Sequence, residues 1–168
     1  MRRRFFVPTL LLMIGCAFTL TACAGADQEG SASHRMSVWV SGTSLGEGMG
    51  TLVADNARIA KDVPNGTGAV HAACATMLND AEMANTNLPS PDPDVTEMLT
   101  KAYNDEGTAA NQCYSAGATN RSLLAQSARN AIKAEAIYEQ VLQRIRQIDG
   151  RTPSTTTTTD NSSGSIFG

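Results

Sequence analysis

The sequence is poor in aromatic residues and lacks the short motifs that mark common catalytic sites. One Trp, three Tyr and four Phe in 168 residues predict a slim core built mainly from alanine and aliphatic side chains. There is no G-x-S-x-G, no phosphate-binding loop and no zinc-ligand spacing. The two histidines, His34 and His71, do not form the Glu-x-x-His pairs of di-iron helical bundles. These absences argue against an enzyme and predict no cofactor.

Long apolar runs are also missing, except near the start of the chain. Residues 2–4 are three arginines, and residues 5–20 form an almost uncharged apolar run, short for a membrane span but suited to a signal peptide. The run ends at Leu20-Thr21-Ala22-Cys23, an aliphatic residue followed by small residues and a cysteine. This motif resembles the lipobox of bacterial, actinobacterial-type lipoproteins. Ordinary secretion, with cleavage after Ala24-Gly25-Ala26, is the alternative.

The resemblance implies that residues 1–22 are removed as a signal peptide and that Cys23 becomes a lipidated N-terminus. Two or more acyl chains, such as palmitate, would hold the protein stably, whereas one chain alone binds only marginally. The expected location is therefore the extracytoplasmic face of the cell membrane, with a lipid anchor.

Positive charge is scarce beyond the leader. Residues 1–22 hold three of the 13 basic residues and none of the 16 acidic ones, so the remaining 146 residues carry a formal charge of −6. This negative charge argues against a nucleic-acid partner and against electrostatic docking on anionic lipid. Membrane contact is expected through Cys23.

Only two cysteines, Cys74 and Cys113, follow Cys23. In an oxidising compartment such a pair predicts one disulfide. The disulfide would close a loop of about 40 residues and contribute about 4 kcal/mol in the chain-entropy account.

Composition divides the mature chain into three parts. Residues 23–36 are small and polar and predict a flexible tether, and residues 37–150 are expected to form the folded domain. Residues 151–168 are rich in Thr and Ser and predict a disordered tail. Residues 37–41 alternate apolar and polar side chains, which favours an extended lead-in or an early helical turn over a strand.

Four segments carry apolar residues at alternating spacings of four and three, the pattern of amphipathic helices. They run from about Ser44 to Asp62, Thr67 to Asn85, Asp92 or Asp94 to Ala116, and Thr119 or Asn120 to Ile148. Short breaks between them predict an all-α, antiparallel four-helix bundle. Ser44 and Glu47 have the spacing of a capping box at the start of the first helix.

Two details of this bundle are left open by the sequence. Cys74 and Cys113 lie at heights that differ by about 13 Å along their helices, so either the proline-rich segment 88–93 climbs the bundle or the third helix bends at Gly107. Glycines and one alanine also repeat every fourth residue from Gly42 to Ala54, which favours close approach of a neighbouring helix. The alternative is a surface on which a ligand touches backbone.

His71, Cys74 and Met77 share one side of their helix, and imidazole, thiolate and thioether together are a copper-type ligand set. The favoured interpretation is a disulfide cysteine flanked by a core methionine and a partly exposed histidine. An oxidising compartment would convert the free thiolate that a metal site needs into a disulfide.

Asn56, Glu106 and Glu135 occupy apolar positions of the pattern on three different helices. Buried carboxylates there could act as an acid/base pair or bind a cation. The favoured interpretation is that they lie at the flank of the apolar face or fix the register of the helices.

The sequence thus predicts a membrane-anchored, extracytoplasmic lipoprotein whose helical domain is non-catalytic and either binds a protein, lipid or glycan or supports an envelope assembly. Small Ala and Gly side chains could leave or close a cavity for an apolar ligand. A metal- or redox-handling lipoprotein using His71, Cys74 and Met77 is the alternative.

Overall fold

The computed structural model describes residues 30–150. The signal peptide, Cys23, most of the expected tether and the Thr/Ser-rich tail lie outside the described residues. Within 30–150 no helix is long and apolar enough to cross a membrane.

The described residues form helices and no strands, so the predicted all-α fold is confirmed. The bounds are α1 Ala32–Gly42, α2 Leu45–Asp62, the 3-10 turn η1 Val63–Asn65, α3 Thr67–Asn85, α4 Pro93–Ala116 and α5 Arg121–Ile148. The four predicted segments match α2 to α5 to within about a residue or two, which is the usual uncertainty of helix ends.

Local chemistry explains where the long helices begin. Asp92 accepts a hydrogen bond from the backbone N–H of Val95 at 3.0 Å and caps α4, and Asn120 caps α5 by accepting from Leu123 N–H at 3.1 Å. Arg144 of α5 donates to both carboxylate oxygens of Asp92, at 2.8 and 3.3 Å, and so fixes the start of α4 against α5.

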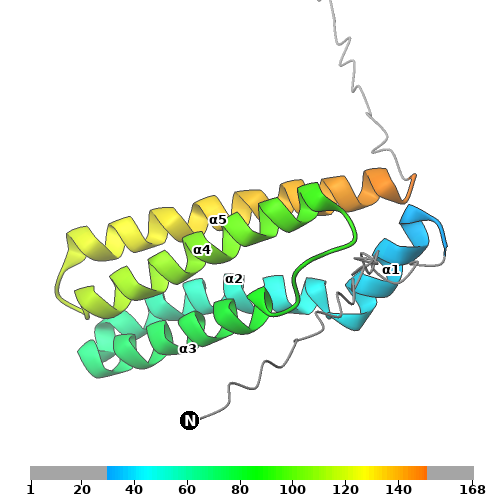
Figure 1. The fold of residues 1–168 in the computed structure, drawn as a ribbon. Coiled ribbons are helices and arrows are strands. Elements are labelled where there is room, and N and C mark those ends of the chain that lie inside the picture. The colour runs from blue at the N-terminus through cyan, green and yellow to red at the C-terminus, as the bar shows by residue number, and fades with distance from the viewer. Residues whose placement is uncertain (1–29, 151–168) are drawn as a thin grey trace, which may run out of the picture.

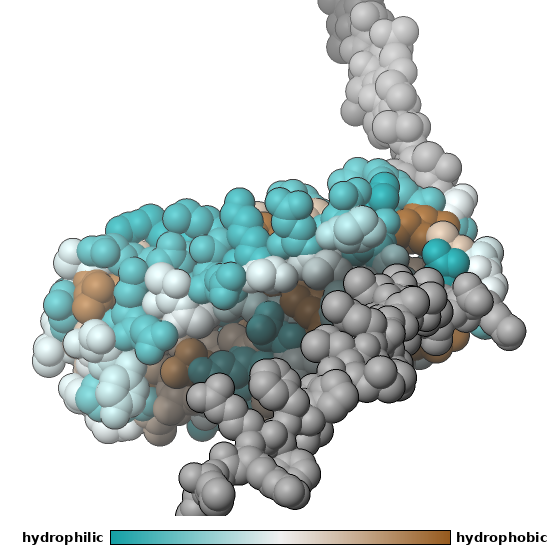
Figure 2. All heavy atoms as spheres, viewed as in Figure 1, coloured by the Kyte–Doolittle hydropathy of each residue, from teal (hydrophilic) through white to brown (hydrophobic). Residues whose placement is uncertain are grey.

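Helices α2 to α5 run up and down in sequence, each beside the next (Figure 1). The segment between α3 and α4, residues 86–92, rises along the bundle before α4 begins (Figure 1). This rise offsets the expected difference in height between Cys74 and Cys113 along their helices. The predicted Cys74–Cys113 disulfide therefore forms between α3 and α4, with 5.8 Å between the two Cα atoms. Along the upper edge of the face in Figure 2, the surface of α5 is largely hydrophilic.

The core consists of two apolar clusters along the bundle. One surrounds the disulfide and includes Val70, Met77 and Ala109. The other, which includes Leu52, Leu99 and Val141, lies toward α1. Many of the buried side chains are alanines, as expected from the low aromatic content.

Helix α1 is a fifth helix, where the sequence predicted at most an early helical turn over residues 37–41. It begins at Ala32, inside the segment expected to be a tether, and it crosses the end of the bundle where α5 ends (Figure 1). Met36 is 1% exposed, and Trp39 Nε1–H donates to the Asn87 carbonyl at 3.1 Å. Apolar contact with the bundle therefore makes α1 part of the domain.

Two local predictions were wrong. Ser44 has φ of +49° and its side chain makes no cap bond, because the chain turns there directly from α1 into α2 and an N-cap needs extended backbone. The glycine stripe does not receive a neighbouring helix: Gly42, Gly46 and Gly50 are exposed, and a Cβ at each would meet nothing within 4 Å.

Candidate functional site

In the described part of the molecule, a groove with a volume of about 440 Å³ lies between α2 and α5. It exists because α2 packs on α3 and α5 packs on α4, while α2 and α5 touch only sparsely. Its walls are mainly small or aliphatic side chains: Ile59, Ala60, Val63, Leu124, Ala125, Ala128, Ala131 and Ile132. We call this feature the α2/α5 groove.

Several apolar residues of the groove are open to solvent. Ile132 is 62% exposed, and Ala60, Ala125 and Ala128 are exposed as well. The alanines keep the two helices' side chains from meeting, so the space stays open. Apolar surface exposed in a concave site is typical of binding sites.

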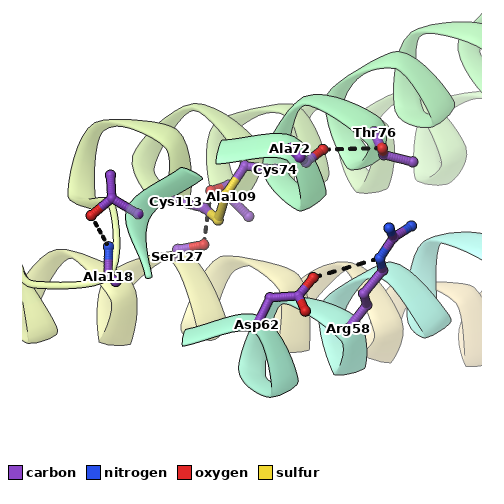
Figure 3. The surroundings of a disulfide bond; sticks show 10 residues. Arg58, Asp62, Ala72, Cys74, Thr76, Ala109, Cys113, Ala118 and Ser127 are labelled. Atoms are coloured by element: carbon purple, nitrogen blue, oxygen red, sulfur yellow. Dashed lines mark hydrogen bonds and ion pairs between the residues drawn. A yellow bond between two sulfur atoms is a disulfide. The ribbon is translucent and has the colours of Figure 1, made fainter. Parts of the chain in front are cut away.

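The floor of the groove is fixed by contacts near the disulfide. Ser127 is 5% exposed, and its hydroxyl donates to the carbonyl oxygen of Ala109 at 2.8 Å, which ties α5 to α4 (Figure 3). The Cys74–Cys113 disulfide lies beside this bond and ties α4 to α3 (Figure 3). One wall of the groove is therefore anchored to a cross-linked pair of helices.

One end of the groove is polar. Asn56 of α2 and Glu135 of α5 both line it, and Asn56 Nδ2–H donates to Glu135 Oε1 at 3.3 Å. Glu106 of α4 is fully buried and accepts a long hydrogen bond from the Tyr138 hydroxyl, at 3.5 Å. The structure thus brings together the three polar residues singled out in the sequence, although Glu106 does not line the groove.

Burial dominates the electrostatics of Glu106. The pKa of that carboxyl is raised to about 8: burial and the nearby Glu135 and Asp55 carboxylates raise it, and the polar Asn56 and Tyr138 side chains oppose the rise. At neutral pH Glu106 is therefore mostly protonated. Its Oε2 atom has no hydrogen-bond partner among residues 30–150.

Asp55 and Asp80 add a second acidic pair that the sequence did not reveal. Asp55 is 7% exposed, and burial, followed by the hydrogen bond and charge of Asp80, raises its pKa to about 6. Asp55 lies three residues after Leu52 and four before Ile59, and this spacing places it on the buried face of α2. The sequence therefore contained a signal for the burial of Asp55. Each of α2 to α5 therefore contributes one carboxyl group to this region.

The residues of the alternative copper-type set, His71, Cys74 and Met77, lie outside the groove and make other contacts. Cys74 is bonded to Cys113 and offers no thiolate, and Met77 is fully buried. The His71 ring stacks on Tyr114 with 4.2 Å between ring centroids. Within residues 30–150, no group of three or more His, Cys, Asp or Glu side chains is placed to hold a metal ion.

The described part of the molecule thus contains an apolar groove with a carboxylate at one end and a buried, protonated carboxyl group behind it. Comparison of the chain with protein-family models, with curated proteins and with solved structures finds no match.

Proposed function

We propose that this protein is a lipid-anchored, extracytoplasmic binding protein that holds an amphipathic small molecule in the α2/α5 groove. The observation that carries the proposal is the groove itself, with apolar walls along most of its length and a polar end at Asn56 and Glu135. The proposed role is non-catalytic, because the two buried carboxyl groups with raised pKa values, Glu106 and Asp55, do not line the groove.

Size and composition support a small ligand. Small-molecule sites typically enclose about 300–1,000 Å³ and combine apolar walls with a few polar groups. The α2/α5 groove, at about 440 Å³, lies in this range. Burying exposed apolar surface yields about 25 cal/mol per Å², so an apolar ligand body covering Ile132 and the exposed alanines gains affinity.

Binding is tested with N-phenyl-1-naphthylamine, an uncharged probe whose fluorescence rises in apolar surroundings. The protein is the mature chain, expressed without its leader and carrying Cys23→Ala. Ala128→Phe should fill the groove and reduce probe binding strongly. The matched control is Ala136→Phe, because Ala136 is also an exposed alanine of α5 but does not line the groove. Absent binding, or equal effects of the two variants, would contradict the proposal.

The anchor is a separate part of the proposal and has its own test. The lipobox at Leu20–Cys23 and the formal charge of −6 beyond the leader support attachment by acyl chains and not by surface charge. Cys23→Ala should release the protein from membranes in a fractionation experiment. Membrane retention of the variant at wild-type level would contradict lipidation at Cys23.

A further inference from the structure

The polar end of the α2/α5 groove carries an unbalanced negative charge. Glu135 is the single charged side chain that lines the groove among the described residues. Within 30–150 it forms no salt bridge, and its hydrogen-bond partner Asn56 is neutral. Arg58, a basic residue of the facing helix α2, pairs with Asp62 at 3.6 Å. A carboxylate therefore borders a largely apolar space without a cation of its own.

The groups behind Glu135 do not neutralise its charge. Glu106 is fully buried and mostly protonated at neutral pH, so it adds no positive or negative charge. Asp55 is nine-tenths buried, and its Oδ2 has no hydrogen-bond partner in the described range. Arg58 lies near Asp55, but no basic side chain of the described residues lines the groove, so the Glu135 carboxylate favours a cationic group there and repels a second anion.

We infer that the ligand of the α2/α5 groove is an amphipathic organic cation, with a protonated amine at Glu135 and an apolar body along the alanine-lined wall toward Leu124. The ammonium group donates hydrogen bonds to the Glu135 carboxylate, which Asn56 holds in place from α2. From Glu135 to Leu124 the wall of α5 extends about 16 Å, so a medium-length alkyl chain can lie along it.

This inference rests on the proposed function, and the experiment separates the two. Decylamine, decanol and decanoate share one apolar chain and differ only in the headgroup. Each is used below its micellar concentration, at neutral pH and moderate salt, to displace N-phenyl-1-naphthylamine from the mature Cys23→Ala chain. We expect decylamine to bind about tenfold more tightly than decanol, as a charge-assisted hydrogen bond allows, and decanoate to bind most weakly.

Glu135→Gln should remove the preference for decylamine while leaving the affinity for decanol unchanged. Glu139→Gln is the matched control: it removes the same charge from an exposed position of α5 outside the groove. It should leave the preference intact, because general attraction to an acidic protein is weak and screened by salt.

The outcomes are distinct. Equal affinities for the three compounds would overturn the assigned headgroup and leave groove binding standing. Equal loss of decylamine affinity in Glu135→Gln and Glu139→Gln would also overturn the headgroup, since the attraction would then be general. If neither the compounds nor the fluorescent probe binds, the groove does not bind small amphiphiles and both proposals fall.

Discussion

At the scale of single residues, Glu106 is an ionisable side chain in an apolar environment. A carboxyl group is fully buried in a bundle core and is kept neutral by that burial. Its hydrogen-bond partner, the Tyr138 hydroxyl, comes from α5. Glu106 therefore links α4 to α5, and the folded state must keep it protonated.

This proton predicts how stability depends on pH. In the unfolded chain Glu106 loses its proton near its ordinary pKa of 4.5, whereas in the folded protein it keeps it up to about pH 8. Between these values the folded state binds more protons than the unfolded state, so the free energy of unfolding falls by about 1.4 kcal/mol per pH unit. Glu106→Gln should remove this slope, as measured by urea unfolding from pH 6.5 to 8.

Asp55 produces a similar slope at lower pH, up to about 6, which is why the measurement begins above that value. Glu97→Gln, an exposed site on the same helix as Glu106, is the control and should keep the wild-type slope. An unchanged slope in Glu106→Gln would mean that Glu106 is ionised in the folded protein.

Gly117, at the end of α4, is a second residue whose replacement should be costly. Its φ of +55° and ψ of −154° lie in a region used almost only by glycine, and a Cβ there would come within 2.7 Å of Thr67 Cγ2. Gly117→Ala should lower the free energy of unfolding by about 1–3 kcal/mol in urea unfolding. Gly68→Ala, where a Cβ meets nothing within 4 Å, should not destabilise; equal effects would contradict the argument.

Sequence spacing predicted the polar residues of the site only in part. Asn56, Glu106 and Glu135 were found because each interrupts an apolar pattern. Asp55 and Asp80 were missed because a spacing pattern assigns a face but does not measure burial at its edge. That Glu106 is buried while Glu135 reaches the groove depends on helix rotation, which the pattern leaves undetermined.

At the scale of elements, α2 is weakened by glycines that no packing requires. Gly50→Ala should raise the free energy of unfolding by about 0.5–1 kcal/mol, because alanine loses less backbone entropy in a helix and its methyl group meets open space. Gly66→Ala is the contrasting variant: its surroundings are equally open, but its φ is +92°. It should destabilise, and thermal unfolding of both variants separates the effect of backbone conformation from that of packing.

Helices α2 to α5 were predictable because each has a repeating apolar face and a Gly- or Pro-containing break on at least one side. Helix α1 was not, because it buries one residue fully, Met36, and its amphipathic pattern is weak. Met36, Trp39 and Val40 do have helical spacing, and Ser31 caps the first turn by accepting from His34 N–H. This signal was too short to outweigh the polar composition around it.

At the scale of the whole molecule, the disulfide is the main covalent contribution to stability. It spans a sequence separation of 39 and cross-links α3 to α4 inside an apolar cluster. Replacing both cysteines, Cys74→Ala with Cys113→Ala, should lower the free energy of unfolding by about 4 kcal/mol. Urea unfolding with and without reductant checks this.

Reductant should destabilise the wild type and leave the double variant unaffected. Equal stability of the two proteins under oxidising conditions would show that the disulfide does not constrain the unfolded chain.

The α2/α5 groove, unlike the disulfide, could not be predicted, because spacing shows which residues face inward but not how far apart two helices stand. The alanines that leave it open could equally have let the helices close together.

The position of α1 also brings the two ends of the described domain together. The Ser33 hydroxyl donates to Asp149 Oδ1 at 3.0 Å, so the chain enters and leaves the bundle at the same end. Adjacent ends permit circular permutation: a short linker could join residues 30 and 150, and the chain could be reopened at the α4–α5 turn. The groove would then keep its walls while the order of its helices in the sequence changed.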